Sequence, residues 1–169
     1  MSLRIRFALV GALSLAIALG AVGTLGAETI MLAVQETVDG NPGVPPLPTV
    51  EGVSDGLFDA GHIVFDAGKV APTAKTAELA KLARDANAGW LLRVAVVYTQ
   101  TKVDQDVFRV SCSATFSLVN AESGATSFTD KVSATNSGRE RSTDRGALGM
   151  ELGKMISQKV ARALPQPSL

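Results

Sequence analysis

Strict alternation of apolar and polar residues over residues 107–119 is the clearest pattern in the chain. A period of two predicts a β-strand with one face in the core and the other face polar. A turn-forming stretch follows at residues 120–124, and apolar residues then recur in phase up to residue 134. The two segments therefore predict a long antiparallel hairpin. The residues expected on its buried face are Phe108, Val110, Cys112, Ala114, Phe116, Leu118, Phe128, Val132 and Ala134.

The opposite face of this hairpin is expected to carry short polar side chains, most of them serine or threonine. Two residues of the second strand, Thr126 and Asp130, are polar although they stand in the apolar phase, and they weaken the pattern near the turn. The residues expected on the polar face are Arg109, Ser111, Ser113, Thr115, Ser117, Ser127, Thr129, Lys131, Ser133 and Thr135.

Three shorter apolar runs predict further strands at residues 29–34, 62–67 and 90–100. The third run is apolar at nearly every position in its first half, as expected for a central strand that is covered on both faces there. The exception is Arg93, whose long side chain is expected to reach an edge of the sheet. Residues 39–48 contain four prolines and two glycines. They predict an extended connecting loop, with a hinge or a partner-binding segment as the alternative.

Helical spacing of apolar residues predicts two helices before the hairpin. Residues 71–88 are the more regular segment, with Pro72 suited to the first turn and Gly89 to the carboxyl-terminal cap. A weaker helix is predicted at residues 50–60, where Gly61 can end it. The residues expected on the buried sides are Ala77, Leu79, Ala80, Leu82, Ala83 and Ala86 in the first and Val53, Leu57 and Ala60 in the second, and those expected in solvent are Lys75, Glu78, Lys81 and Asp85.

The last predicted helix runs from about residue 143 to residue 164. Ser142 or Thr143 can cap it, and Asp144 favours its first turn through the helix dipole. Glycine recurs within it at intervals of three and four residues, at a cost of about 1 kcal/mol each in helix propensity, which predicts a close approach of this helix to the sheet. These glycines are Gly146, Gly149 and Gly153, and the core stripe is expected to be Leu148, Leu152, Met155, Ile156 and Val160.

The elements follow the order strand, helix, strand, helix, strand, strand, strand, helix. This order predicts an α+β fold with a mixed sheet of about five strands and helices packed mainly on one face. One domain is expected over residues 28–164, followed by a disordered tail at residues 165–169.

Residues 1–27 have the three regions of a secretory signal peptide in the right order. Arg4 and Arg6 precede an uncharged, mostly aliphatic run, and small residues follow up to Ala27, so the mature protein is expected to begin at Glu28. The alternative is a retained membrane anchor, because the uncharged stretch is close to the 20 or so residues that a spanning helix needs. Four glycines dilute its apolar character, which favours cleavage. No cysteine stands near the cleavage region, so neither a lipid nor another stable membrane anchor is expected after cleavage.

Charge and cysteine content narrow the function further. Without its first 27 residues the chain keeps 142 of its 169 residues, with 14 basic and 16 acidic side chains and a net charge of −2. A nucleic-acid binder needs a basic surface, so nucleic acid is excluded as a partner, and there is no polybasic attraction to an anionic membrane. The single cysteine cannot form an internal disulfide, so the fold must be stabilised by packing alone.

Residues that carry chemistry are few. A catalytic triad or a histidine base would have to use the only histidine, His62, whose place at the start of a strand favours a structural role. Cys112 stands in the apolar phase of its strand, where burial makes a thiol inert. Asp104 and Asp106 are expected to be solvated turn residues. We therefore expect no catalytic residue, no cofactor and no bound metal.

The densest group of charges lies between residues 139 and 145. A solvated loop is the simpler interpretation. The alternative is that Arg139, Arg141 and Arg145 form a docking site for an acidic surface of a partner protein.

Four phrases of the sequence resemble a group of bacterial envelope domains. They lie at residues 61–66, 78–86, 89–94 and 116–124, and read GHIVFD, ELAKLARDA, GWLLRV and FSLVNAESG. The group includes the amino-terminal domain of the Tol–Pal propeller protein, the periplasmic domain of the curli export lipoprotein, lipoprotein activators of penicillin-binding proteins and flagellar accessory lipoproteins. Many of its members are lipidated, which this chain is not expected to be. The resemblance implies scaffolding between envelope proteins rather than catalysis.

These observations predict an exported, non-catalytic periplasmic protein that binds another envelope protein during assembly of the envelope or a surface appendage, such as a flagellum or a secretion system. Two alternatives stay open. The chain could be a self-assembling structural subunit, favoured by the serine- and threonine-lined strand face, or a small-ligand-binding domain or enzyme whose site the sequence does not reveal.

Overall fold

The structure is a computed structural model that describes residues 27–42, 47–68, 70–71, 73–105, 107–135 and 145–165. Most of the predicted signal peptide, the arginine-rich segment up to residue 144 and most of the predicted tail lie outside the described residues. The elements are β1 (Thr29–Val38), β2 (Asn41–Pro42), α1 (Pro48–Asp59), β3 (Ile63–Asp66), α2 (Thr76–Asp85), β4 (Trp90–Asp104), β5 (Val107–Asn120), β6 (Thr126–Thr135) and α3 (Arg145–Ala163).

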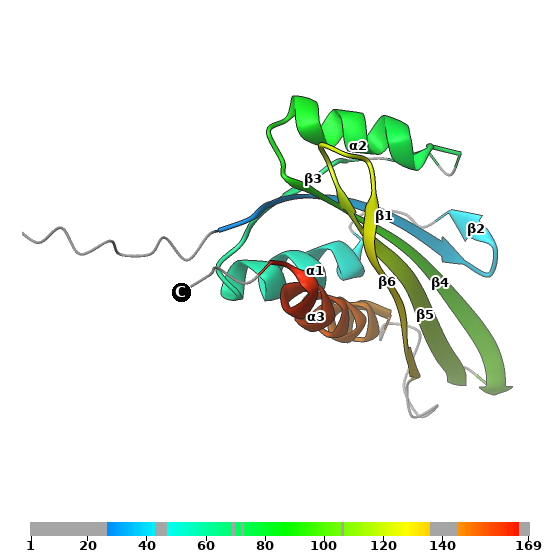
Figure 1. The fold of residues 1–169 in the computed structure, drawn as a ribbon. Coiled ribbons are helices and arrows are strands. Elements are labelled where there is room, and N and C mark those ends of the chain that lie inside the picture. The colour runs from blue at the N-terminus through cyan, green and yellow to red at the C-terminus, as the bar shows by residue number, and fades with distance from the viewer. Residues whose placement is uncertain are drawn as a thin grey trace, which may run out of the picture.

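The strands form one mixed sheet in which β4 is central (Figure 1). The order across the sheet is β2-β1-β4-β5-β6, and β3 pairs with the first part of β1. β1 runs parallel to β3 and β4, whereas the pairs β1–β2, β4–β5 and β5–β6 are antiparallel. Helices α1 and α3 lie side by side on one face, and α2 lies on the other. The predicted α+β class, the mixed sheet and the element order are confirmed, with two-residue β2 as the one addition.

Two cores result from this arrangement. The larger core lies between the sheet and the pair α1–α3 and includes Leu57, Leu92, Phe116 and Leu152. A smaller core lies under α2 and includes Leu91. Leu91 and Leu92 are both fully buried, which confirms that β4 is covered on both faces in its first half. Burial of each large apolar side chain contributes about 1.5–3 kcal/mol.

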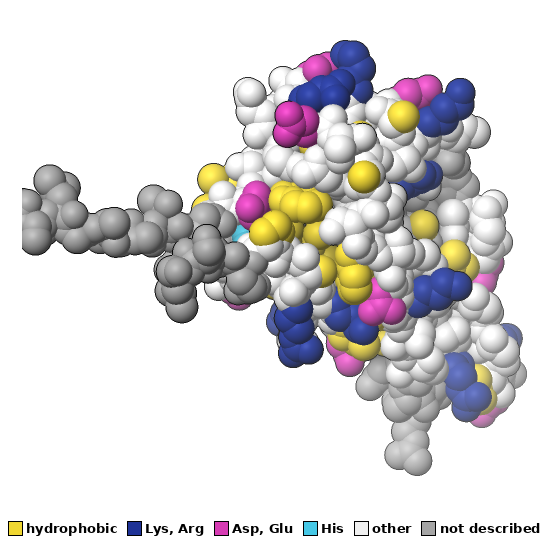
Figure 2. Space-filling view, in the orientation of Figure 1, with side chains coloured by type: hydrophobic (Ala, Val, Ile, Leu, Met, Phe, Trp, Pro, Cys, Tyr) yellow, Lys and Arg dark blue, Asp and Glu magenta, His cyan; other side chains and the backbone are white. Residues whose placement is uncertain are grey.

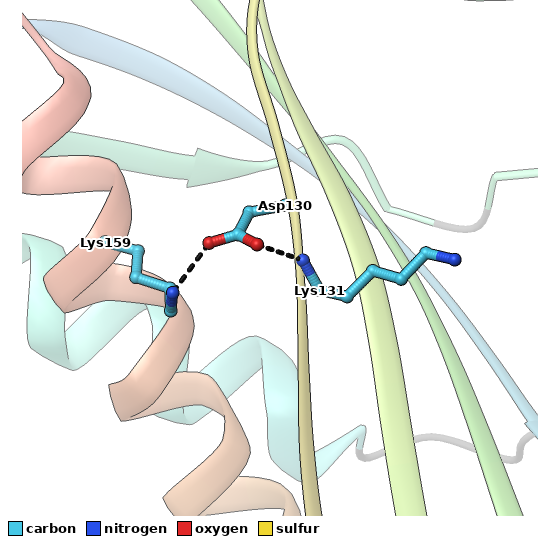
Figure 3. A network of polar contacts seen from close by, with 3 residues as sticks. All are labelled: Asp130, Lys131 and Lys159. Atoms are coloured by element: carbon cyan, nitrogen blue, oxygen red, sulfur yellow. Dashed lines mark hydrogen bonds and ion pairs between the residues drawn. The ribbon is translucent and has the colours of Figure 1, made fainter.

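The long hairpin is confirmed. β5 and β6 pair antiparallel with Cys112 opposite Ala134, and both side chains face the larger core. The side chain of Phe108 lies outside the described residues. Asp130, which interrupts the apolar phase, points to the same side and pairs with Lys159 of α3 at 2.6 Å, while the side chain of Lys131 extends to the opposite side (Figure 3).

The helix predicted over residues 71–88 is shorter than expected. α2 covers only Thr76–Asp85, Pro72 lies outside the described residues, and Asn87 rather than Gly89 takes the left-handed conformation after the helix, with φ 58°. Only Leu79, Ala80 and Ala83 are buried among its residues, so the expected burial of Ala77, Leu82 and Ala86 is wrong. The reason is that α2 lies alone on its face of the sheet, and only a narrow stripe of it contacts the strands.

The loop predicted over residues 39–48 is partly wrong. β1 continues to Val38, turns at Asp39 and Gly40 with φ 49° and 83°, and pairs with β2. α1 then begins at Pro48, because proline suits the first turn of a helix. Its end is as predicted, since Gly61 has φ 87°.

The sequence predicted that the glycines of the last helix approach the sheet, but their main neighbour is α1, and only Gly149 also contacts a sheet residue. Gly153 packs against Gly52 and Val53 of α1, and Gly149 packs against Pro48 and the hydroxyl group of Tyr98. Gly146 has open space around its Cα. α1 has its own glycines at positions 52 and 56, so both helices present glycine four residues apart at their contact. The absence of side chains there allows the two backbones to approach closely.

Candidate functional site

α2 leaves part of its face of the sheet uncovered, and mostly polar side chains line this part. We call it the open face, on the side opposite α1 and α3. Register places Thr37, Val97, Ser113 and Ser133 side by side across β1, β4, β5 and β6. Val97 is 48% exposed at the centre of this row. The open face consists of Gln35, Thr37, Ala95, Val97, Thr99, Thr101, Arg109, Ser111, Ser113, Thr115, Ser117, Thr129, Lys131, Ser133 and Thr135.

The charges on the open face have one sign. Arg109 and Lys131 are exposed, and neither has an acidic partner within 4 Å among the described residues. Between Arg93 and Thr101 of β4, the outward positions and their register partners on the neighbouring strands include no carboxylate. The face is therefore weakly basic and otherwise hydroxyl-lined, and each hydroxyl group can donate and accept a hydrogen bond.

Arg93 does not reach an edge of the sheet, contrary to the expectation from the sequence. Its strand is central, and its Nη1 donates a hydrogen bond of 2.8 Å to the hydroxyl oxygen of Thr76 at the start of α2. The half-buried guanidinium thereby connects the sheet to the first turn of α2. Its contact is structural.

A buried polar cluster lies on the opposite side of the sheet, where β1, α1 and β4 meet. The backbone nitrogen of Thr49 donates a hydrogen bond of 3.2 Å to Oε1 of Glu36, and the hydroxyl groups of Thr49 and Tyr98 lie 3.0 Å apart. Burial raises the pKa of the Glu36 carboxyl and of the Tyr98 hydroxyl. Because the carboxylate lies at the amino terminus of α1, the helix dipole favours its charge. The cluster positions α1 on the sheet.

The residues predicted to bind a partner are only partly within the described structure. Arg139 and Arg141 lie outside it. Arg145 is the exposed first residue of α3, and its positive charge acts against burial by lowering the pKa of Glu36 and of Tyr98. The docking role of the three arginines stays a prediction.

The two residues considered for catalysis, His62 and Cys112, show no catalytic arrangement among the described residues. Nδ1 of His62 is buried and has no hydrogen-bond partner among the described residues. Cys112 is 3% exposed, and burial raises the pKa of its thiol to about 11, so the group is protonated at neutral pH. Within the described ranges, no three histidine, cysteine or acidic side chains lie close enough together to hold a metal ion. None of the three helices in the described part of the chain is long and apolar enough to cross a membrane.

Comparison with known proteins places the fold. No protein-family model and no curated protein matches the chain. Among solved structures, the PelC dodecamer from Paraburkholderia phytofirmans is 19% identical, with 78% of this chain and 87% of that chain covered and a TM-score of 0.55. The hypothetical protein CT253 from Chlamydia trachomatis is 13% identical, with 80% and 96% covered and a TM-score of 0.50. Lipoprotein GNA1162 from Neisseria meningitidis is 20% identical, with 79% and 98% covered and a TM-score of 0.48.

At these identities the likeness shows that the α+β fold is shared and nothing finer. The named envelope domains that the sequence phrases resemble are not confirmed by it. Of the open face and the buried polar cluster, only the open face is accessible to another molecule.

Proposed function

We propose that this chain is an exported, non-catalytic envelope protein that acts by binding another envelope protein through the open face. The observation that supports this proposal is the uncovered half of a well-packed sheet. Its inner side packs against α1 and α3, whereas its outer side presents hydroxyl groups, Val97 and two cations that have no acidic partner among the described residues.

The side chains of the open face suit a protein contact. Serine and threonine are short, so little side-chain entropy is lost when a partner covers them, in contrast to lysine or glutamate. Their hydroxyl groups can satisfy polar groups of the partner in either direction. An exposed valine among them supplies apolar area at the centre, where interfaces are most apolar.

The free edge of β6 is a less suitable contact. β6 pairs with β5 alone among the described strands, so it leaves a row of backbone groups that a further strand could pair with. Charged residues disfavour such pairing, and β6 carries Lys131 pointing outward and Asp130 pointing inward (Figure 3). We therefore place the contact on the face rather than at the edge.

The proposal is tested by affinity capture of the full-length chain from the envelope fraction of its own cells. Ser113→Arg places a long charged side chain in the middle of the open face. Ala77→Arg is the matched control, because Ala77 is exposed on α2. We expect the wild type and the control to retain one stoichiometric protein partner that Ser113→Arg loses. Recovery of a small molecule in place of any protein would contradict the proposal and support a ligand-binding domain.

A second candidate is a self-assembling subunit, in which the partner is another copy of this chain. The observation that favours it is the fold shared with PelC, whose solved structure is a dodecamer. Under this candidate the captured protein is the chain itself, and the native mass is a multiple of the monomer mass.

A further inference from the structure

Helix α1 carries the negative charge that the open face lacks. Glu51, Asp55 and Asp59 recur every four residues along α1 and are exposed, so they form a row along one side of the helix. α1 contains no lysine or arginine. None of the three carboxylates has a cationic partner within 4 Å among the described residues. We call this surface the acidic row.

An exposed aromatic residue accompanies the acidic row. Phe58 is 73% exposed, the highest exposure among the large apolar side chains described. At 100° per residue it lies within the same side of α1 as Glu51 and Asp55. Phe58 stands next to Asp59, at the carboxyl-terminal end of the acidic row. Acidic groups with an apolar neighbour are the complement of the open face, where Arg109 and Lys131 accompany Val97.

We propose that the acidic row of one copy binds the open face of a second copy. This inference rests on the self-assembly candidate and names its two surfaces. The complementary charges of the two surfaces indicate that a second copy binds the open face, because opposite charges across an interface favour the contact and like charges oppose it. The Phe58 ring of one copy, at one end of the acidic row, then packs against the open face of the next.

The acidic row is short enough to lie between the two cations of the open face. The acidic row spans eight residues of helix, about 12 Å. Arg109 lies on β5, and Lys131 of β6 lies opposite Thr115 of β5. Positions 109 and 115 are six β5 residues apart, about 20 Å, with Ser113 between them. The acidic row therefore fits between the two cations, with the row of Val97 and Ser113 beneath it.

The placement of the two surfaces determines the kind of assembly. α1 lies on one side of the sheet and the open face on the other (Figure 1). A contact between different surfaces of identical chains is heterologous, so each copy still offers one free surface of each kind. Repetition of such a contact closes into a ring or continues as a filament, and it does not stop at a two-fold dimer. In the space-filling view, basic and acidic side chains lie next to one another at the top of the molecule, where Figure 1 places α2 (Figure 2).

Two charge-reversed proteins test the pairing. Arg109→Glu with Lys131→Glu makes the open face acidic, and Glu51→Lys with Asp55→Lys makes the helix basic. Each full-length chain is purified from the envelope fraction and measured by sedimentation velocity over a concentration series, with a thermal melt to verify folding. We expect each variant to self-associate at least about tenfold more weakly than the wild type, because like charges then meet. A 1:1 mixture of the two variants, and a chain with all four substitutions, should associate again.

The control is Lys81→Glu, a lysine on exposed α2 outside both surfaces, which should associate as the wild type does. Association of the wild type should also weaken between 50 mM and 500 mM salt, since exposed charges are screened. Undiminished association of either double variant, or failure of the mixture to associate, would overturn the inference. A monomeric wild type would overturn it as well, while capture of a different envelope protein by that monomer would leave the first proposed function standing.

Discussion

Alanine in place of Gly153 should force α1 and α3 apart. A Cβ at this position would lie 2.6 Å from the backbone nitrogen of Val53 and 2.7 Å from the carbonyl carbon of Gly52. Ordinary contacts between such atoms lie at about 3.5–4.0 Å. Backbone atoms cannot rotate aside as a side chain can, so the helices must separate by about 1 Å along their contact.

Two opposing effects determine the magnitude. Overpacking of a core costs about 1–3 kcal/mol, and contact with backbone atoms places this substitution near 3 kcal/mol. Alanine is favoured over glycine by about 1 kcal/mol in helix propensity, which offsets part of the cost of overpacking. The net expectation is a loss of about 2 kcal/mol in the free energy of unfolding. Gly146→Ala is the matched control, because nothing lies within 4 Å of a Cβ there. It should be neutral or stabilise by up to about 1 kcal/mol.

Urea denaturation followed by circular dichroism measures both changes, provided that the dependence on urea is unchanged between variants. The two substitutions replace the same residue type in the same helix, so any effect on the unfolded chain is nearly equal. The reasoning fails if Gly153→Ala is as stable as the wild type or more stable, because the two helices would then not meet at this glycine.

Three further predictions concern other parts of the chain. Amino-terminal sequencing of protein from the envelope fraction should begin near Glu28, and an intact start would support a retained anchor instead. Cys112 should react slowly with a thiol reagent in buffer and rapidly in denaturant, and Cys112→Ala should cost about 1 kcal/mol or slightly more; rapid labelling of the native protein would show that the strand phase is reversed. The hydrogen bond from Lys159 lowers the pKa of Asp130, so this pair stabilises the fold above the usual carboxyl pKa of about 4 and loses that contribution as the pH falls through the lowered value. Asp130→Asn should therefore destabilise the protein at pH 7 and much less at pH 2, and an equal loss at both would exclude the ion pair as the cause.

The sequence pattern was most informative where neighbours along the chain decide the structure. The alternation in β5 predicted the buried side of the hairpin, since Cys112 and Phe116 are both buried while Ser113 and Thr115 are exposed. The end of α1 could also be predicted from the local sequence, because Gly61 can adopt a positive φ at little cost. Such features need only the spacing and the type of adjacent residues.

Features that depend on distant residues were missed or misassigned. β1 was predicted to end at Val34, whereas Glu36 continues its inward-facing phase. The buried carboxylate of Glu36 is stabilised by a hydrogen bond from the backbone nitrogen of Thr49 at the amino terminus of α1. The predicted close contact exists at Gly149 and Gly153 but not at Gly146, and its main neighbour is α1 rather than the sheet. Gly153 meets Gly52, about a hundred residues earlier, and no local pattern distinguishes a helix from a sheet as the opposing surface.

The open face could be foreseen only as a polar strand face. Its exposure depends on how far α2 extends over the sheet, and α2 is shorter than its pattern predicted. The docking role expected for the three arginines stays a prediction, because Arg139 and Arg141 lie outside the described residues and Arg145 is the exposed first residue of α3.

The central claim is that the open face contacts another protein in the cell. Site-specific photocrosslinking tests it directly, with a photoreactive amino acid in place of Ser113 and, as control, in place of Lys81 on α2. Both positions are exposed, and they differ in whether they belong to the open face. The account predicts a discrete protein adduct from position 113, with a second copy of the chain or a different envelope protein, and none from position 81. Equal labelling from both positions, or no protein adduct from position 113, would contradict it.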